Sequence, residues 1–277
     1  VPMGLSFRVS PRTRGARRGS DRRPEKSPAP GTIAARAGWR DVEGETRMAR
    51  HPDGAWPFHD GARPASLVGL IGGRIVPSFT LNALRKAGRM PGSPPWPWID
   101  RAGMLALGAV VVADLVAPDS AASGAIATVA ALLALARLAR WHGHATLGQP
   151  ILLVLHLAYL LIPAALGAKA AFLLADAAWA SAWLHLQASG AIALMIMAVM
   201  TRATLGHTGR ELVAPRLAVV AYVLVPVAAA LRSFGDAVIP YPTALALAAG
   251  VWIGAFGLFV LVFAPMLVAP AWVREAR

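Results

Sequence analysis

The chain has 277 residues, of which 56% are hydrophobic and only 15% are charged. Soluble domains average about 25% charged residues, so this composition favours an integral membrane protein. The absence of cysteine excludes disulfides, thiolate metal sites and cysteine-ligated iron–sulfur clusters. The formal net charge of +13 does not indicate nucleic-acid binding, because the basic residues lie in an N-terminal segment and in short loops between apolar runs.

Residues 1–64 form a segment of their own, rich in Arg, Gly, Pro, Ala and Ser. They hold 13 of the 27 Lys and Arg residues and 7 of the 14 Asp and Glu residues, without apolar periodicity. We expect them to be disordered, and they lack the apolar core of a signal peptide. Their composition resembles that of a GC-rich gene read in the wrong frame or from an upstream start. A genuine basic tail is the open alternative.

A transmembrane domain is predicted for residues 65–277. Ala65–Val76 is apolar but short, since a helix that crosses a bilayer needs about 20 residues. We expect this partial helix to break at the boundary, where Gly72-Gly73 is followed by Pro77. Six full spans are predicted after it, approximately at residues 102–117, 124–140, 150–168, 182–203, 216–234 and 243–268.

The predicted fold is therefore all-α, a polytopic bundle of about six full spans and a partial N-terminal one. Ala170–Trp179 is apolar but interrupted by Asp176, and we expect it to be a surface or re-entrant helix. Lys and Arg alternate between frequent and rare in successive loops. The positive-inside rule then predicts that the 77–101 loop, His207 and the C-terminus face the cytoplasm.

Three histidines are candidate ligands. His156 lies about six residues into the third span, where an imidazole either binds haem or copper or is a buried side chain bonded to a helix carbonyl. His185 is near the outer end of the fourth span, either as a ligand or as an interfacial residue of an aromatic belt. His207 lies between glycines, as a ligand, an anion contact or part of a turn. His156 and His185 start their spans from opposite sides, which favours two centres, or one ligand and one bystander.

Other polar residues carry weaker signals. Arg202 ends an apolar span, where it either pairs with a carboxylate or haem propionate or snorkels to lipid headgroups. The sequence shows no paired carboxylates, no Ser/His/Asp arrangement and no phosphate-binding loop, and Asp114 is the one acid in the predicted spans. Surface positions are favoured for His142 and His144, and core packing is favoured over copper binding for Met195, Met197 and Met200.

The segment Ala198–Arg210, AVMTRATLGHTGR, resembles the NnrS family of membrane proteins. The resemblance covers about residues 66–277. Further blocks agree with the family in the same order: Gly72–Thr80 with Asn82, Arg140-Trp141 with Pro150–His156 and Tyr159, and Leu184-His185 leading to Gly190.

This resemblance implies a helix bundle that holds haem and copper in the inner membrane of a bacterium, with a role in nitric oxide metabolism or nitrosative stress. It makes His156, His185 and His207 the favoured metal ligands. Arg74, Arg202 and Arg210 become the possible propionate partners. A redox or ligand-binding role, with nitric oxide or a related small molecule as ligand, is favoured over hydrolysis or phosphoryl transfer.

Proteins of this family have around twelve spans, so we expect the chain to correspond to the C-terminal half of such a protein. If ligands from both halves share a site, the chain alone would bind no haem. The alternatives are a multi-pass secondary transporter or permease and a truncated, non-functional fragment.

Overall fold

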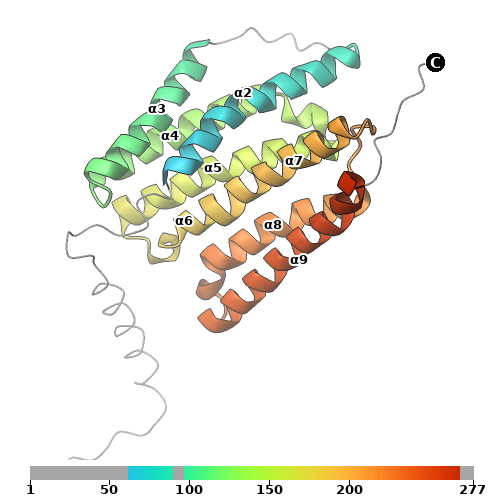
Figure 1. Cartoon of the computed structure of the whole chain (residues 1–277). Coiled ribbons are helices and arrows are strands. Elements are labelled where there is room, and N and C mark those ends of the chain that lie inside the picture. The colour runs from blue at the N-terminus through green and yellow to red at the C-terminus, as the bar shows by residue number, and fades with distance from the viewer. Residues whose placement is uncertain (1–61, 90–96, 269–277) are drawn as a thin grey trace, which may run out of the picture. The chain divides into compact units, whose positions relative to one another are not determined.

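A computed structural model describes residues 62–89 and 97–268, all within one compact unit of residues 55–277. The described residues form helices joined by short turns (Figure 1), which confirms the predicted all-α bundle. The prediction of disorder concerns residues that, apart from 62–64, lie outside the described part. The elements are α2 (Ala62–Lys86), α3 (Pro97–Val116), α4 (Ala121–Arg140), η2 (Gly143–Thr146), α5 (Pro150–Ala175), η3 (Ala178–Ala180), α6 (Trp183–His185), the π-helix η4 (Leu186–Ile192), α7 (Ala193–His207), α8 (Arg216–Phe234), η5 (Gly235–Ala237) and α9 (Tyr241–Val268).

Five helical segments of the described chain are long and apolar enough to cross a membrane, and the chain is a membrane protein. They correspond to the last five predicted spans. The predicted span 102–117 falls within α3, which is not among the five because its 20 residues include three charged side chains. The five segments are Ala121–Arg140, Pro150–Ala175, Ala178–His207, Arg216–Ala237 and Tyr241–Val268.

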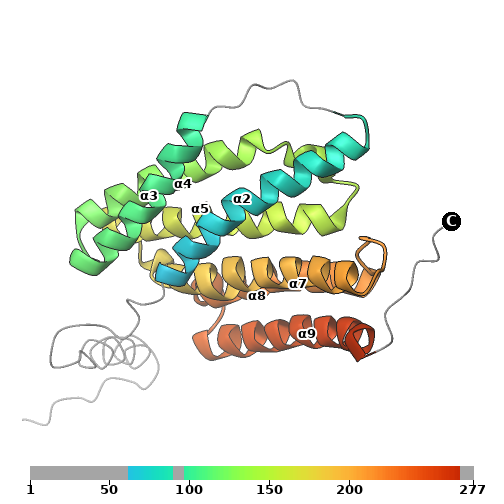
Figure 2. The same cartoon turned by 45° about the horizontal axis from the view of Figure 1, so that its top comes forward.

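Helix α5 lies at the centre of the bundle and α9 at its edge. Of their most apolar stretches, 72% of α5 but only 11% of α9 is buried. Figures 1 and 2 show α5 between α4 and α7, with α9 running alongside α8. Small residues allow close packing, since a Cβ on Gly190 would lie only 3.0 Å from the Cβ of Ala229.

The predicted helix break before Pro77 is wrong. Helix α2 runs for 25 residues, from Ala62 to Lys86, with Pro77 inside it. Proline has no amide hydrogen, so it leaves the carbonyl of Gly73 without its helical partner. A side chain of α4, Arg137, donates to that carbonyl instead, and the helix continues.

The predicted separate helix at Ala170–Trp179 is also wrong. Helix α5 is continuous from Pro150 to Ala175 and ends at Asp176, which adopts a left-handed conformation with φ 48°. Lys169, which falls just after the predicted span 150–168, is buried inside α5 and forms an ion pair with Asp114 of α3. The ion pair offsets the cost of burying the lysine charge, so Lys169 can lie inside the helix bundle.

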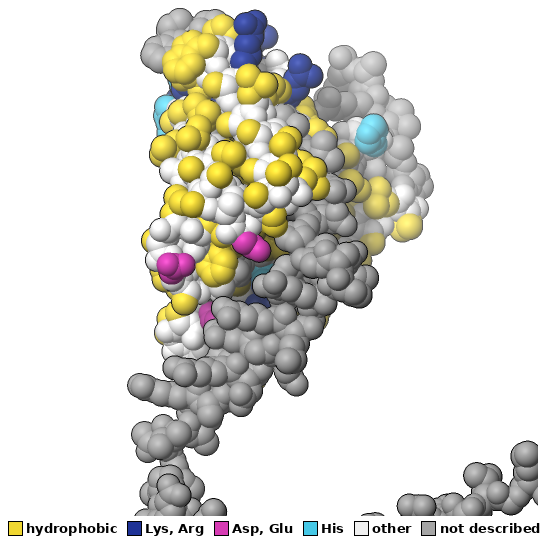
Figure 3. Space-filling model, turned by 90° about the vertical axis from the view of Figure 1, so that its left-hand side faces the viewer, with side chains coloured by type: hydrophobic (Ala, Val, Ile, Leu, Met, Phe, Trp, Pro, Cys, Tyr) yellow, Lys and Arg dark blue, Asp and Glu magenta, His cyan; other side chains and the backbone are white. Residues whose placement is uncertain are grey.

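Charged side chains gather at the ends of the helices. We call the end where α2 and α4 finish and α5 begins the basic end, because α2 and α4 finish with Arg85, Lys86 and Arg140. Figure 3 shows one face with Lys and Arg at one end, Asp and Glu toward the other, and hydrophobic side chains between them. This agrees with the positive-inside pattern. The side of the membrane that the basic end faces stays a prediction.

Candidate functional site

A cavity of about 420 Å³ lies at the opposite end of the bundle, where α6, η4, α8 and α9 meet. Such a volume is typical of small-molecule sites, which are mostly apolar with a few polar groups. Here the polar groups are His185, Ser189 and Arg232. The remaining lining residues are apolar: Ala228, Leu245, Ala248, Ala249, Trp252 and Ile253.

His185 and Arg232 are in direct contact in this cavity. The Arg232 Nη2 lies 2.8 Å from the His185 Nε2. A guanidinium only donates hydrogen bonds, so Nε2 accepts this bond through its lone pair and the ring proton is on Nδ1. Arg232 also lies over the ring of Tyr241, at 5.8 Å from its centroid. Within 62–89 and 97–268 no carboxylate forms an ion pair with Arg232.

A π-helical segment positions His185. The seven residues Leu186–Ile192 form η4, directly after α6. Wider π-turns change the direction in which neighbouring side chains point and are frequent at functional sites. The Ser189 hydroxyl donates to the His185 carbonyl at 2.6 Å and so ties the histidine to the first turn of η4.

The donor set of this cavity fits a haem. An axial histidine binds iron through a ring nitrogen with a free lone pair, and arginines pair with carboxylates such as propionates. The His185 Nε2 has a lone pair, which here accepts the Arg232 bond, and Arg232 supplies a cation that has no carboxylate partner in the described structure. The apolar walls, including Trp252, suit a flat hydrophobic ring system.

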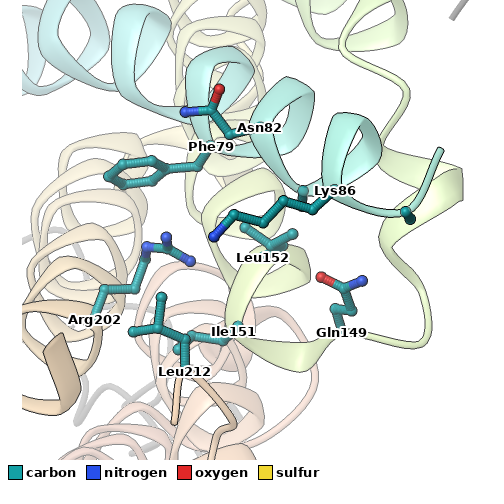
Figure 4. A pocket seen from close by; sticks show the side chains of 10 residues that line it. Phe79, Asn82, Lys86, Gln149, Ile151, Leu152, Arg202 and Leu212 are labelled. Carbon is teal, nitrogen blue, oxygen red and sulfur yellow. The ribbon is translucent and has the colours of Figure 1, made fainter. Parts of the chain in front are cut away.

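A second cavity, of about 360 Å³, lies at the basic end between α2, α5, α7 and the loop after α7. Figure 4 shows Lys86 and Arg202 extending into the same space from different helices. The Arg202 guanidinium lies over the face of Phe79, at 4.1 Å from the ring centroid. No histidine lines this cavity.

His156 lies in the core of the bundle and lines neither cavity. Its Nδ1 is 3.1 Å from the carbonyl oxygen of Leu152, one turn back on α5, so Nδ1 carries a proton. Its Nε2 is 3.4 Å from the Thr80 hydroxyl. Gly143 packs against the ring so closely that a Cβ there would lie 2.8 Å from Cδ2. The ring is thus held by packing and hydrogen bonds.

The structure does not bring the three histidines together. Trp183, two residues before His185, stacks on the ammonium group of Lys169 at 4.9 Å. Lys169 is 13 residues from His156 along α5, which corresponds to roughly 20 Å of helix. His207 is exposed at the end of α7, at the basic end. In the part of the chain that the structure describes, no three His, Asp or Glu side chains converge on a metal site.

The three arginines predicted to hold propionates lie away from His185. Arg202 lines the cavity at the basic end, and Arg74 is exposed on α2. The Arg210 Nη1 donates to the carbonyl of Met266 on α9 at 3.4 Å. Sequence reasoning missed Arg232, although a signal existed. Arg232 is the only charged residue of α8 after its first position, and it lies near the same end of its span as His185.

Comparison with known proteins identifies one family. A family model described as "NnrS protein" matches residues 64–271, which is more than half of the chain. The match begins where α2 begins and extends just beyond the end of α9. No curated protein and no solved structure matches the chain.

Proposed function

Because the chain belongs to the NnrS family, we propose that it is a haem-binding membrane protein of nitric oxide metabolism or the nitrosative-stress response. The observation that supports this proposal is the His185–Arg232 contact inside an apolar cavity. In this proposal His185 would hold the haem iron, and Arg232 would pair with a propionate.

Each residue of the site has a separate part in holding the group. His185 lines the cavity with its Nε2 beside Arg232, and the Ser189 hydroxyl donates to the backbone carbonyl of this histidine. Arg232 would pair with a propionate, and the His185 imidazole would hold the iron. The apolar side chains of α8 and α9 exclude water from the ring face. When bound, haem supplies a redox-active iron with a position for a diatomic ligand.

Copper is the second metal that the family implies, and the described residues do not offer it a comparable site. Three converging His, Asp or Glu side chains are absent from residues 62–89 and 97–268. Met195 and Met197 are buried in the core, and the Met195 methyl group packs against Gly72. These contacts are typical of core methionines, so no residue is assigned to copper.

Absorption spectroscopy of the full chain, purified in mild detergent, tests the proposal. We expect a Soret band, haem extractable as a pyridine haemochrome, and a shift of that band when nitric oxide is added to the reduced protein without oxygen. A preparation with no Soret band and no extractable haem, from cells supplied with haem precursor, would contradict the proposal.

One observation favours a secondary transporter as the second candidate. The predicted span 182–203 is not a regular α-helix throughout, because it contains the π-helix η4. Transporters build substrate sites from irregular membrane helices. The buried Gln187 Oε1 in η4 has no hydrogen-bond partner in the described structure. Uptake of a solute into proteoliposomes by haem-free protein would favour this alternative.

A further inference from the structure

The cavity at the basic end has a different chemistry from the His185 cavity. Lys86 is the last residue of α2, and Arg202 lies on α7, yet both extend into this one space (Figure 4). Its lining contains no acidic side chain and no histidine. It therefore offers two positive charges and no axial ligand for a haem.

The two cations are not neutralised within the described structure. The ion pairs among the described residues are Arg137–Asp100 and Lys169–Asp114, and neither Lys86 nor Arg202 takes part in one. Among the described residues, the Arg202 guanidinium lies against the face of Phe79 and not against a carboxylate. Like charges that converge on a partly apolar cavity repel each other, and an anion between them removes that cost.

A helix start adds to the positive field. Helix α5 is 26 residues long and begins at Pro150, and three residues of its start line the cavity: Gln149, Ile151 and Leu152. The first turn of a long helix carries a partial positive charge that favours anions. The Gln149 side chain forms no capping bond with the helix. Gln149 and Asn82 are both among the residues that line the cavity.

The other half of the lining is apolar. Phe79, Ile151, Leu152 and Leu212 provide a hydrophobic wall beside the two cations. The cavity also lies at the basic end, and basic helix ends of membrane proteins are typically found at the level of the lipid headgroups. A phosphate group, whether free or attached to an apolar body, matches this combination of two cations, two amides and a hydrophobic wall.

We propose that the Lys86–Arg202 cavity binds a phosphate group, either the headgroup phosphate of an anionic phospholipid or inorganic phosphate. This inference does not depend on haem binding. A haem-free protein with an intact Lys86–Arg202 cavity would still show phosphate binding, so the two proposals can fail separately.

Titration of the detergent-purified full chain tests the proposal, with native mass spectrometry as readout for phosphatidylglycerol and phosphatidylcholine and calorimetry for inorganic phosphate. The test variants are Lys86→Gln and Arg202→Gln. The matched control is Arg85→Gln, which removes the same charge from an exposed neighbour that does not line the cavity. We expect each test variant to weaken binding by about tenfold or more, because each loses a charge-assisted hydrogen bond.

The outcomes separate the two sources. If the test variants lose affinity only for phosphatidylglycerol, the ligand is a lipid. If they lose affinity for inorganic phosphate, the ligand is the free ion. The proposal is overturned if Arg85→Gln weakens binding as much as Lys86→Gln, or if the test variants match the wild-type chain both in inorganic phosphate affinity and in preference for phosphatidylglycerol over phosphatidylcholine. If Arg202→Gln lowers the melting temperature, the exposed Lys86→Gln variant alone decides.

Discussion

Arg137 of α4 donates a hydrogen bond from Nη2 to the carbonyl oxygen of Gly73 on α2, at 3.2 Å. The acceptor is free because Pro77, four residues later, has no amide hydrogen to donate. The Arg137 Nε donates to Asp100 and its Nη1 to the Tyr159 hydroxyl, each at 3.0 Å. One buried arginine thus connects α2, α3, α4 and α5 and satisfies a carbonyl that the proline leaves open.

Replacement of Gly73 by alanine should destabilise this connection. A Cβ at position 73 would lie 2.5 Å from the Arg137 Nη2, too close for both groups to stay in place. We expect a loss of about 1–3 kcal/mol in the free energy of unfolding, as for other overpacked cores. Gly108→Ala is the control, because a Cβ at Gly108 would meet nothing within 4 Å. Thermal unfolding in detergent measures both, and equal stability of the two variants would contradict the prediction.

The effects of Arg137 and Pro77 should be coupled. Arg137→Met leaves the Gly73 carbonyl without a donor, and we expect it to cost about 2–4 kcal/mol of stability. Pro77→Ala provides an amide hydrogen for the same carbonyl, so Arg137→Met should cost about 1 kcal/mol less in that background. A double-mutant cycle measures the difference. Costs that add within about 0.5 kcal/mol would show that the carbonyl does not link the two residues.

Asp114 should stabilise the fold because it neutralises a buried positive charge. Its carboxylate pairs with the buried Lys169 and accepts a hydrogen bond from the Ser123 hydroxyl at 3.0 Å. Asp114→Asn leaves a buried ammonium group unpaired, which typically costs about 3–5 kcal/mol. The added change Lys169→Met should restore much of the loss, whereas the exposed Asp119→Asn should alter stability by less than about 0.5 kcal/mol. Chemical unfolding in detergent measures these changes. Equal free energies of unfolding for Asp114→Asn and Asp119→Asn would contradict the prediction.

The helix bundle could be predicted from sequence because long uncharged runs have no other stable arrangement than membrane helices. The ends of some helices could not be predicted, because they depend on contacts with residues far away in the sequence. Pro77 predicts a break, and only Arg137, 60 residues later, allows α2 to continue. Lys169 would be assigned to a loop from the sequence, because a lysine is rarely buried without a partner. The structure shows that its partner is Asp114, 55 residues earlier.

The candidate site shows the same limit. The sequence identified His185 as a candidate but not Arg232, because the two residues are 47 positions apart in the sequence and only the fold brings them together. The π-helix that sets the direction of His185 leaves no mark in the apolar pattern. The propionate roles of Arg74, Arg202 and Arg210 stay a prediction; Arg202 lines the cavity at the basic end, and Arg210 donates to the Met266 carbonyl of α9.

Arg232 should affect haem retention. We expect Arg232→Gln to increase the rate at which haem transfers to excess apomyoglobin by about tenfold, because a charge-assisted bond to a propionate is lost. Arg216→Gln removes the same charge from the exposed start of α8 and should leave the rate unchanged. The transfer is followed by absorbance. Equal rates for the two variants would remove Arg232 from the site.

The most direct measurement is the haem content of purified His185→Ala protein beside that of His207→Ala. Both variants remove an imidazole from the same membrane segment, Ala178–His207, but only His185 lines the apolar cavity with Arg232. The account predicts that His185→Ala loses the Soret band while His207→Ala keeps the haem content and spectrum of the wild type. A His185→Ala protein with an unchanged haem content and spectrum would contradict it.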